Sequence, residues 1–260
     1  MIHLNRKRRH PIRSDTNVQR IKHRLQSAAV RSHQTCVHGA DNQISNIFVL
    51  RRYHQKGSDV RTHALYIQRC VQRPQAIKPS DSTQNAIPSK IFLTPKKLPS
   101  GAIDKMKARL VAGGHHQDRS LYTAISSPTA SLTAVSAQAA LAAQRGDSIL
   151  TLNHKAAYLN AVMKGPAVKM ILSKEVSTIL CEISNEFKVY LRANRTILVQ
   201  LEKALYGCIK SAVLWYDELS NTLKDLGYTK NPYDTCVFNK IRDGQIDSIL
   251  VYVDDLLLTS

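Results

Sequence analysis

The sequence predicts an α+β fold, in which helices cover one face of a small antiparallel sheet. Residues 237–239 and 246–253 have the pattern of two strands, and the Arg242-Asp243-Gly244 segment between them is a tight turn, so they form a β-hairpin. Apolar or small side chains suited to helix packing recur in three longer stretches between residues 130 and 226. Hairpins combined with such helices indicate a mixed architecture.

The composition indicates a folded chain in an intracellular setting. It has 260 residues, 43% of them hydrophobic, which suffices for a real core. No apolar run approaches the roughly 20 residues of a membrane span, and residues 1–13 are basic without the apolar stretch of a signal peptide. The five cysteines are odd in number and far apart, which favours reduced thiols. We therefore expect neither secretion nor a membrane partner.

The positive charge is concentrated in the first third of the chain. Residues 1–86 hold 16 Lys and Arg against 4 Asp, and so carry +12 of the net charge of +18. Such charge can give sequence-independent affinity for nucleic acid through counterion release. A basic segment can equally be a solvated tail.

Residues 1–86 are expected to be a disordered or degenerate segment, because they contain no Glu, 7 of the 10 His and only short apolar patches. Residues 6–9 (Arg-Lys-Arg-Arg) could form a nucleic-acid or nuclear-import patch. The spacing of His33, Cys36 and His38 fits no zinc module well. Several prolines and serines near residue 80 are typical of a linker.

Residues 87–260 are expected to form the folded domain. Its predicted strands are 91–93, 107–112, 149–153, 168–172, 196–201, 237–239, 246–253 and 256–259, and its predicted helices are 130–144, 155–162, 174–185 and 215–226. Ser127 is the expected N-cap of the first helix, with Pro128 at the first helical position, and Gly146 is its expected C-terminal cap. Trp215 lies on an apolar helix stripe and is interpreted as a core residue.

Two cations lie on one face of the strand at residues 107–112. Strand alternation places Lys107 and Arg109 together and turns Ala108 and Leu110 to the other face. Two cations on one strand face can hold a triphosphate. Solvated charges on a strand surface would give the same pattern.

Two adjacent carboxylates, Asp254 and Asp255, lie at a turn between two apolar runs, residues 249–251 and 256–258. Charge in such a setting costs free energy unless it is compensated. Aspartates are common in turns because their side chains bond to their own backbone. The functional alternative is a site for a hard divalent cation held by oxygen ligands.

The order and the residues of several motifs decide between a structural turn and a cation site. The motifs are Lys107-Ala108-Arg109-Leu110-Val111-Ala112, Ala156-Ala157-Tyr158-Leu159-Asn160, Lys203-Ala204-Leu205-Tyr206-Gly207, Trp215-Tyr216 and Tyr252-Val253-Asp254-Asp255. Together they resemble the reverse transcriptase of copia-type retrotransposons, over residues 87–260. The resemblance implies an RNA-directed DNA polymerase, a nucleotidyltransferase with a fingers hairpin and a palm.

The resemblance also implies roles for individual residues. Asp254 and Asp255 would hold two Mg²⁺ ions, for which Mn²⁺ can substitute, and the residues implied in substrate binding are Lys107, Arg109, Tyr158, Tyr206 and Gly207. Lys107 and Arg109 would contact the nucleotide, and Tyr158 would be the steric gate against the ribose 2′-OH. Tyr206 and Gly207 would support the templating base pair and the nucleotide. The implied partners are an RNA or DNA template with its primer, and deoxynucleoside triphosphates.

The chain departs from the family pattern at Asn153, where the family has a catalytic aspartate that binds both metal ions. An amide oxygen can coordinate a cation, but it adds no negative charge. Asp147 is six residues away on a strand that advances about 3.3 Å per residue, so it cannot readily replace it. His154 replaces a residue that is usually apolar. We therefore expect this copy to polymerise poorly or not at all.

The chain stops five residues after Asp255, so the sequence predicts a C-terminally truncated palm without a thumb. Two hypotheses remain open. One is a reverse transcriptase fragment that performs two-metal nucleotidyl transfer, and the other is a catalytically inactive remnant that at most binds nucleic acid. A cytoplasmic particle and the nucleus are both compatible locations, and the sequence sets no oligomeric state.

Overall fold

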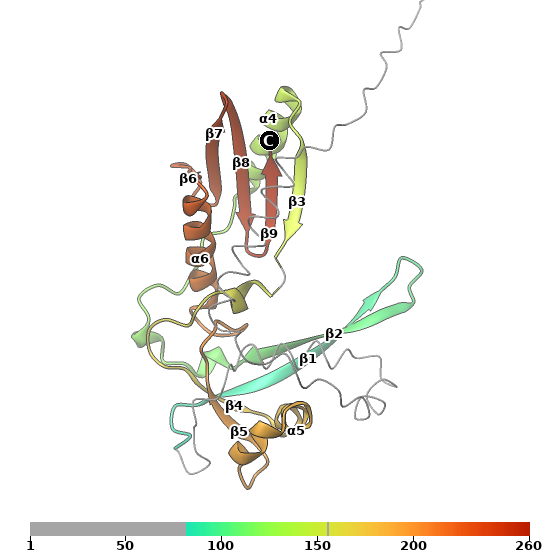
Figure 1. Ribbon diagram of the computed structural model, residues 1–260, viewed down its shortest axis with the longest axis vertical. Helices are drawn as coiled ribbons and strands as arrows, with labels where there is room; N and C mark the ends of the chain where they lie inside the picture. Colours follow the sequence, from blue (N-terminus) through green and yellow to red (C-terminus); the bar gives the residue numbers. More distant parts are fainter. Residues whose placement is uncertain (1–81, 155) are drawn as a thin grey trace, which may run out of the picture.

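In a computed structural model of the protein, the described residues form two β-sheets, one above the other in the view of Figure 1. The structure describes residues 82–154 and 156–260. The interpretations of residues 6–9 and of His33, Cys36 and His38 lie outside these residues. The mixed helix and sheet content expected from the sequence is confirmed.

The lower sheet has four strands in the order β2-β1-β4-β5. Its strands are β1 (Ile87–Lys97), β2 (Ile103–Ala112), β4 (Lys169–Leu172) and β5 (Ile197–Gln200). The first two strands form the predicted hairpin, which projects from the body of the molecule (Figure 1). β1 also pairs in parallel with β4, where Ile87 lies opposite Met170. This parallel pairing attaches the hairpin to the rest of the domain.

A helix and a hydrophobic core support the lower sheet. Helix α5 (Lys174–Ile183) begins at Ser173, whose hydroxyl accepts a hydrogen bond from the backbone N–H of Val176. Val176 and Leu180 of α5 are buried with Phe187 of the following 3-10 helix η4 (Asn185–Tyr190). The predicted amphipathic helix is confirmed, because these positions recur at helical spacing.

The upper sheet has five strands, all antiparallel, in the order β3-β9-β8-β7-β6. Its strands are β3 (Ile149–Asn153), β6 (Thr229–Lys230), β7 (Val237–Arg242), β8 (Gln245–Tyr252) and β9 (Asp255–Thr259). The predicted hairpin between residues 237 and 253 is therefore confirmed. β3 and β9 pair along their whole length, which brings residues 149–153 beside the end of the chain.

Helices lie on both faces of the upper sheet, and the prediction that they cover one face was wrong. Helix α6 (Ser211–Asp225) packs Leu219 and Leu223 against the face that carries Ile249 and Leu258. Helix α4 (Leu132–Arg145) lies on the opposite face, where Gln138 donates a hydrogen bond to the hydroxyl of Thr259. Neighbouring residues of a strand point to opposite faces, so Leu258 and Thr259 contact different helices.

The start of α4 also differs from the prediction. Ser131 is the N-cap, since its hydroxyl accepts from the N–H of Ala134, and Ser127 and Pro128 lie before the helix. Ser131 also donates from its backbone and side chain to the carboxylate of Asp234, which ties the helix start to the segment between β6 and β7. This tertiary contact is invisible to local capping rules. The helix ends as predicted at Gly146, which has a positive φ.

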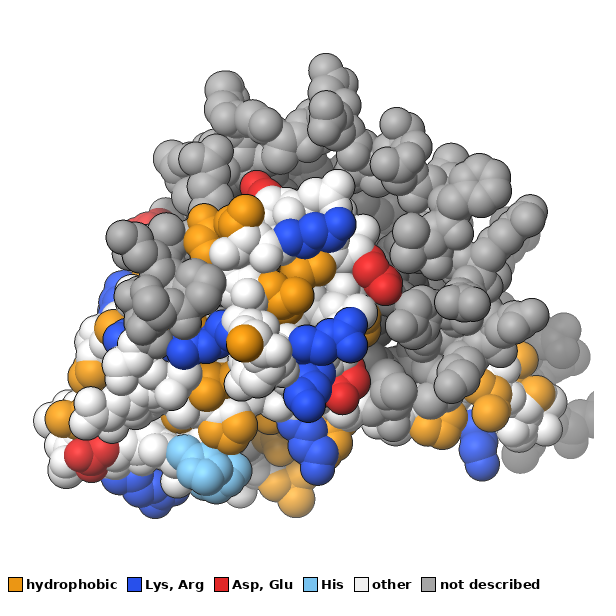
Figure 2. Space-filling model, turned by 90° about the horizontal axis from the view of Figure 1, so that it is seen from below, with side chains coloured by type: hydrophobic (Ala, Val, Ile, Leu, Met, Phe, Trp, Pro, Cys, Tyr) orange, Lys and Arg blue, Asp and Glu red, His pale blue; other side chains and the backbone are white. Residues whose placement is uncertain are grey.

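Lys and Arg side chains are interspersed with hydrophobic ones on the face seen from below, where acidic side chains are few (Figure 2). Within residues 82–154 and 156–260, no helix has the length and apolar character needed to span a membrane.

Candidate active site

The two carboxylates occupy different positions at the β8–β9 connection. Val253 and Asp254 form the two-residue turn, while Asp255 is already the first residue of β9 and pairs with Tyr252. The prediction that both aspartates lie in the turn is therefore correct only for Asp254. Val253 has φ +56°, which is strained for a β-branched residue and costs on the order of 1–3 kcal/mol. Such strain persists only where the surroundings hold the turn in place.

Asn153 contacts Asp255 across the β3–β9 pair. The two residues lie directly opposite each other, and the side-chain amide Nδ2 of Asn153 donates to Oδ1 of Asp255 at 2.6 Å. The structure thus brings Asn153 beside the carboxylate turn. The amide presents a hydrogen-bond donor to this carboxylate.

Two tyrosines lie near Asp254. The ring centroids of Tyr158 and Tyr206 are 4.5 Å apart and tilted by 56°. Burial raises the pKa of both phenols, and the negative charge of Asp254 raises each pKa further. The positive charge of Arg109 on β2 acts in the opposite direction on the pKa of Tyr206. The site therefore combines a carboxylate, two neutral phenols and a guanidinium drawn from four separate motifs.

The segment around Tyr158 is a short 3-10 helix, η3 (Ala157–Asn160), and the longer helix predicted at residues 155–162 was wrong. Asn160 is buried and its side-chain amide donates to the backbone carbonyls of Ala156 and Ala157. A side chain that donates hydrogen bonds to nearby backbone carbonyls competes with the regular hydrogen bonds of an α-helix. The Asn160 side chain therefore favours the short 3-10 helix over a longer helix. No role of Asn160 was expected from the sequence, although Asn160 ends the motif that contains Tyr158.

The Tyr206-Gly207 loop lies directly on the end of β2. The N–H of Ala112 donates to the carbonyl of Tyr206 at 2.8 Å. Gly207 has φ +92°, and a Cβ atom there would lie 2.0 Å from the carbonyl oxygen of Ala112. Only glycine fits this approach. The contact fixes Tyr206 relative to Arg109, three residues before the end of the same strand.

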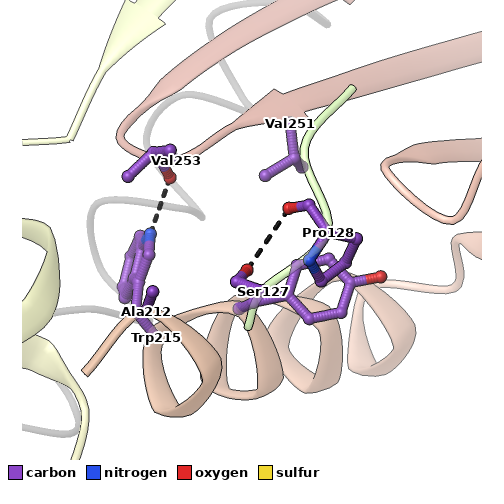
Figure 3. Close-up of a pocket in the computed structure, with 7 residues that line it drawn as sticks. Ser127, Pro128, Ala212, Trp215, Val251 and Val253 are labelled. Atoms are coloured by element: carbon purple, nitrogen blue, oxygen red, sulfur yellow. Dashed lines mark hydrogen bonds between the residues drawn. The ribbon is translucent and has the colours of Figure 1, made fainter. Parts of the chain in front are cut away.

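Two groups from outside the β8–β9 hairpin donate hydrogen bonds to the backbone carbonyls of the turn. The indole Nε1 of Trp215 donates to the Val253 carbonyl at 2.7 Å (Figure 3). The backbone N–H of His154 donates to the Asp254 carbonyl at 2.6 Å. Trp215 also belongs to the core, as predicted. Neither its hydrogen bond nor the contribution of His154 was visible from the sequence.

The structure thus places Asn153 against Asp255 at the turn, and Tyr158 and Tyr206 within reach of the charge of Asp254. Arg109 lies within reach of Tyr206, and Gly207 packs on the end of β2, the strand that carries Arg109. Lys107 lies on β2 opposite Thr94, and its side chain is outside the described part of the chain.

The side chains at this turn do not fit a pair of divalent ions. Hard cations take oxygen ligands, but the amide of Asn153 turns its nitrogen toward Asp255. Only Asp254 and Asp255 then supply negative charge. No group of three or more His, Cys, Asp or Glu side chains gathers anywhere in residues 82–154 and 156–260.

The fold places two carboxylates at a hairpin turn, and a pair of tyrosines within reach of the charge of one of them. Residues 75–260 match the family model "Reverse transcriptase (RNA-dependent DNA polymerase)", and the chain belongs to this family. Enzymes of this family generally use divalent metal ions. The resemblance found in the motifs is thereby confirmed.

The chain is similar to polyproteins of plant transposons. It is 28% identical over 188 residues to the "Retrovirus-related Pol polyprotein from transposon RE1" of Arabidopsis thaliana, covering 70% of this chain and 12% of that protein. It is 27% identical over 156 residues to the corresponding polyprotein from transposon TNT 1-94 of Nicotiana tabacum, covering 59% and 11%. The chain thus matches about a tenth of the length of these relatives. No solved structure matches it.

Proposed function

We propose that this chain is the fingers and palm portion of a copia-type RNA-directed DNA polymerase, with nucleotidyl transfer impaired at Asn153. The observation that carries the proposal is the contact of the Tyr158 and Tyr206 rings, 4.5 Å apart, within reach of the charge of Asp254 and, for Tyr206, of Arg109. The four residues come from four motifs that are far apart in the sequence. Family membership supports a nucleotide as the ligand of this cluster.

Each residue has a distinct task in this proposal. The fingers are the β1–β2 hairpin, where Arg109, together with Lys107, holds the triphosphate by charge-assisted hydrogen bonds. The ring of Tyr158 excludes a ribose 2′-OH by its bulk. Tyr206 and Gly207 support the base pair, and their contact with β2 couples the fingers to the palm.

The reaction class is attack of a primer 3′-OH on the α-phosphate of a deoxynucleoside triphosphate, with release of pyrophosphate. The family performs this chemistry with two bound metal ions, which activate the attacking oxygen and stabilise the leaving one. The carboxylates of Asp254 and Asp255 are the ligands that this chain retains. Asn153 contributes a hydrogen-bond donor in place of a third carboxylate, so this chain lacks one of the negative charges that would hold the ions.

The proposed partners are a primer annealed to an RNA or DNA template, and the complementary nucleotide. The net charge of +18 supports a polyanionic partner. Action in a cytoplasmic particle or in the nucleus is compatible with this proposal.

A second candidate is a catalytically inactive remnant that binds nucleic acid without selecting a nucleotide. The hydrogen bond between Asn153 and Asp255 favours it, because that bond satisfies the carboxylate without a cation.

Template-directed nucleotide binding separates the two candidates. The chain is mixed with a labelled primer–template whose primer lacks a 3′-OH, and the lifetime of the complex is measured with each of the four nucleotides in turn. A longer lifetime with the complementary nucleotide alone, lost in Arg109→Ala, is the result expected of a polymerase site. A complex lifetime that does not depend on the nucleotide would overturn the proposal and support the inactive, nucleic-acid-binding remnant.

A further inference from the structure

The carbonyl groups of the Val253-Asp254 turn are held from outside the hairpin. The turn is short and strained, and the carbonyls of both its residues accept hydrogen bonds from other elements. The donor to Val253 is the indole of Trp215 on α6, and the donor to Asp254 is the backbone N–H of His154, which directly follows β3. The strained turn thus accepts one hydrogen bond from a helix and one from the residue that follows a neighbouring strand.

Trp215 is held rigidly in the position that makes this bond. Its side chain is 4% exposed, and its ring lies against the ring of His154, with centroids 4.8 Å apart. The indole nitrogen points at the Val253 carbonyl, and Ala212 and Val251 line the same small space (Figure 3). Because Trp215 is buried in the core cluster with Leu219 and Val251, its ring cannot swing away without disturbing the core.

We propose that Trp215 is a positioning residue for Asp254, an inference that rests on the proposed function. The bond to the Val253 carbonyl fixes the orientation of the peptide group between Val253 and Asp254. That orientation sets the direction in which the Asp254 side chain leaves the turn, and so its place beside Tyr158 and Tyr206. A change in this peptide group displaces the carboxylate while the surrounding sheet stays intact.

Tyr216 provides a matched control on the same helix. It is also buried, and its hydroxyl donates to the backbone carbonyl of Thr235 at 2.7 Å. Trp215→Phe and Tyr216→Phe therefore each remove one partly buried hydrogen bond from α6 to a backbone carbonyl, and Trp215→Phe also makes the ring smaller. Only the first of these carbonyls belongs to the turn that carries Asp254.

Hydrogen–deuterium exchange of the folded chain tests the inference without requiring catalysis. One lost hydrogen bond changes a local opening equilibrium by about tenfold. Trp215→Phe is expected to accelerate exchange in residues 252–256 by about this factor relative to strand β5 in the other sheet, whereas Tyr216→Phe leaves residues 252–256 unchanged. Equal acceleration in the two sheets, no acceleration in the turn, or the same effect from both variants would overturn the inference.

Steady-state kinetics in the Asn153→Asp background give a second test of the positioning role of Trp215. A misplaced carboxylate affects transfer more than nucleotide binding, so Trp215→Phe is expected to lower kcat by about tenfold or more with KM for the nucleotide unchanged. A raised KM with normal kcat would contradict a positioning role. If Asn153→Asp shows no synthesis at all, the proposed function fails, and the exchange measurement still decides the role of Trp215.

Discussion

Asn153 donates its side-chain amide to Asp255 across the β3–β9 pair, over a distance of 2.6 Å. The two residues lie directly opposite each other, and side chains of directly opposite residues are the closest neighbours across a strand pair. A carboxylate at position 153 would face Asp255 with like charge unless a cation lay between them. The amide makes this arrangement stable without a cation, and the consequences can be measured.

Replacing Asn153 by Asp is expected to make the stability of the chain depend on magnesium. The substitution removes a donor and adds a like charge, at a cost of about 1 kcal/mol in EDTA because both side chains are exposed. Magnesium should restore the lost free energy of unfolding in urea. Asn153→Ala should lose the hydrogen bond without acquiring any magnesium dependence. If magnesium does not change the free energy of unfolding of Asn153→Asp, the two carboxylates do not share an ion.

Replacing Gly207 by Ala is expected to destabilise the chain by roughly 2–4 kcal/mol, because the new methyl group would lie 2.0 Å from the Ala112 carbonyl oxygen at a positive φ. Gly146→Ala is the matched control, since Gly146 also has a positive φ but nothing lies within 4 Å. It should cost about 1 kcal/mol, the backbone contribution alone. Urea unfolding of both variants gives the comparison, and equal losses would show that the loop does not pack tightly on β2.

Alkaline pH is expected to destabilise the fold through Cys208. Burial raises the pKa of this thiol from 9.0 to about 11. The unfolded chain therefore loses the proton first, and the free energy of unfolding falls as the pH rises from about 9 to about 11. At pH near 10.5 the loss from this group is about 2 kcal/mol.

The control for this pH dependence is Cys208→Ala, which cannot titrate at that position. Urea unfolding at pH 8 and near pH 10.5 should show a smaller alkaline loss in the variant than in the unaltered chain. Parallel losses in the two chains would assign the effect to other groups.

Replacing Tyr158 by Ala is expected to admit ribonucleotides. Its ring lies beside Tyr206, and the proposed function assigns it to the space that a 2′-OH would enter. In the Asn153→Asp background, the preference for deoxynucleotides over ribonucleotides should fall by about tenfold or more in Tyr158→Ala. Tyr158→Phe keeps the ring and should keep the preference. Unchanged discrimination in Tyr158→Ala would remove Tyr158 from the nucleotide site.

Local patterns were sufficient to predict the strands that meet at the site. Strand alternation separated Arg109 from the buried Leu110, and the turn residues Asp243 and Gly244 marked the β7–β8 hairpin. These features depend on neighbours in the chain, and so they can be recognised in the sequence. The parallel pairing of β1 with β4 joins segments about 80 residues apart, and no local pattern encodes it.

The errors concern features that tertiary contacts decide. Ser127 and Pro128 satisfy the capping rules, but the contact of Ser131 with Asp234 selects a later start for α4. Asn160 closes a 3-10 turn where a longer helix was expected. The bond from Trp215 to Val253 joins residues 38 positions apart, and an apolar helix stripe predicts burial of the ring without predicting a partner for its nitrogen.

Primer extension on a poly-rA template with an oligo-dT primer and magnesium tests the central claim, that Asn153 limits transfer at an otherwise assembled polymerase site. The unaltered chain, Asn153→Asp, and Asn153→Asp carrying Asp254→Ala and Asp255→Ala are compared at equal concentration. We predict extension by Asn153→Asp that exceeds that of the unaltered chain by about tenfold or more and disappears in the triple variant. Equal extension by the first two chains, or extension by none, would contradict the claim.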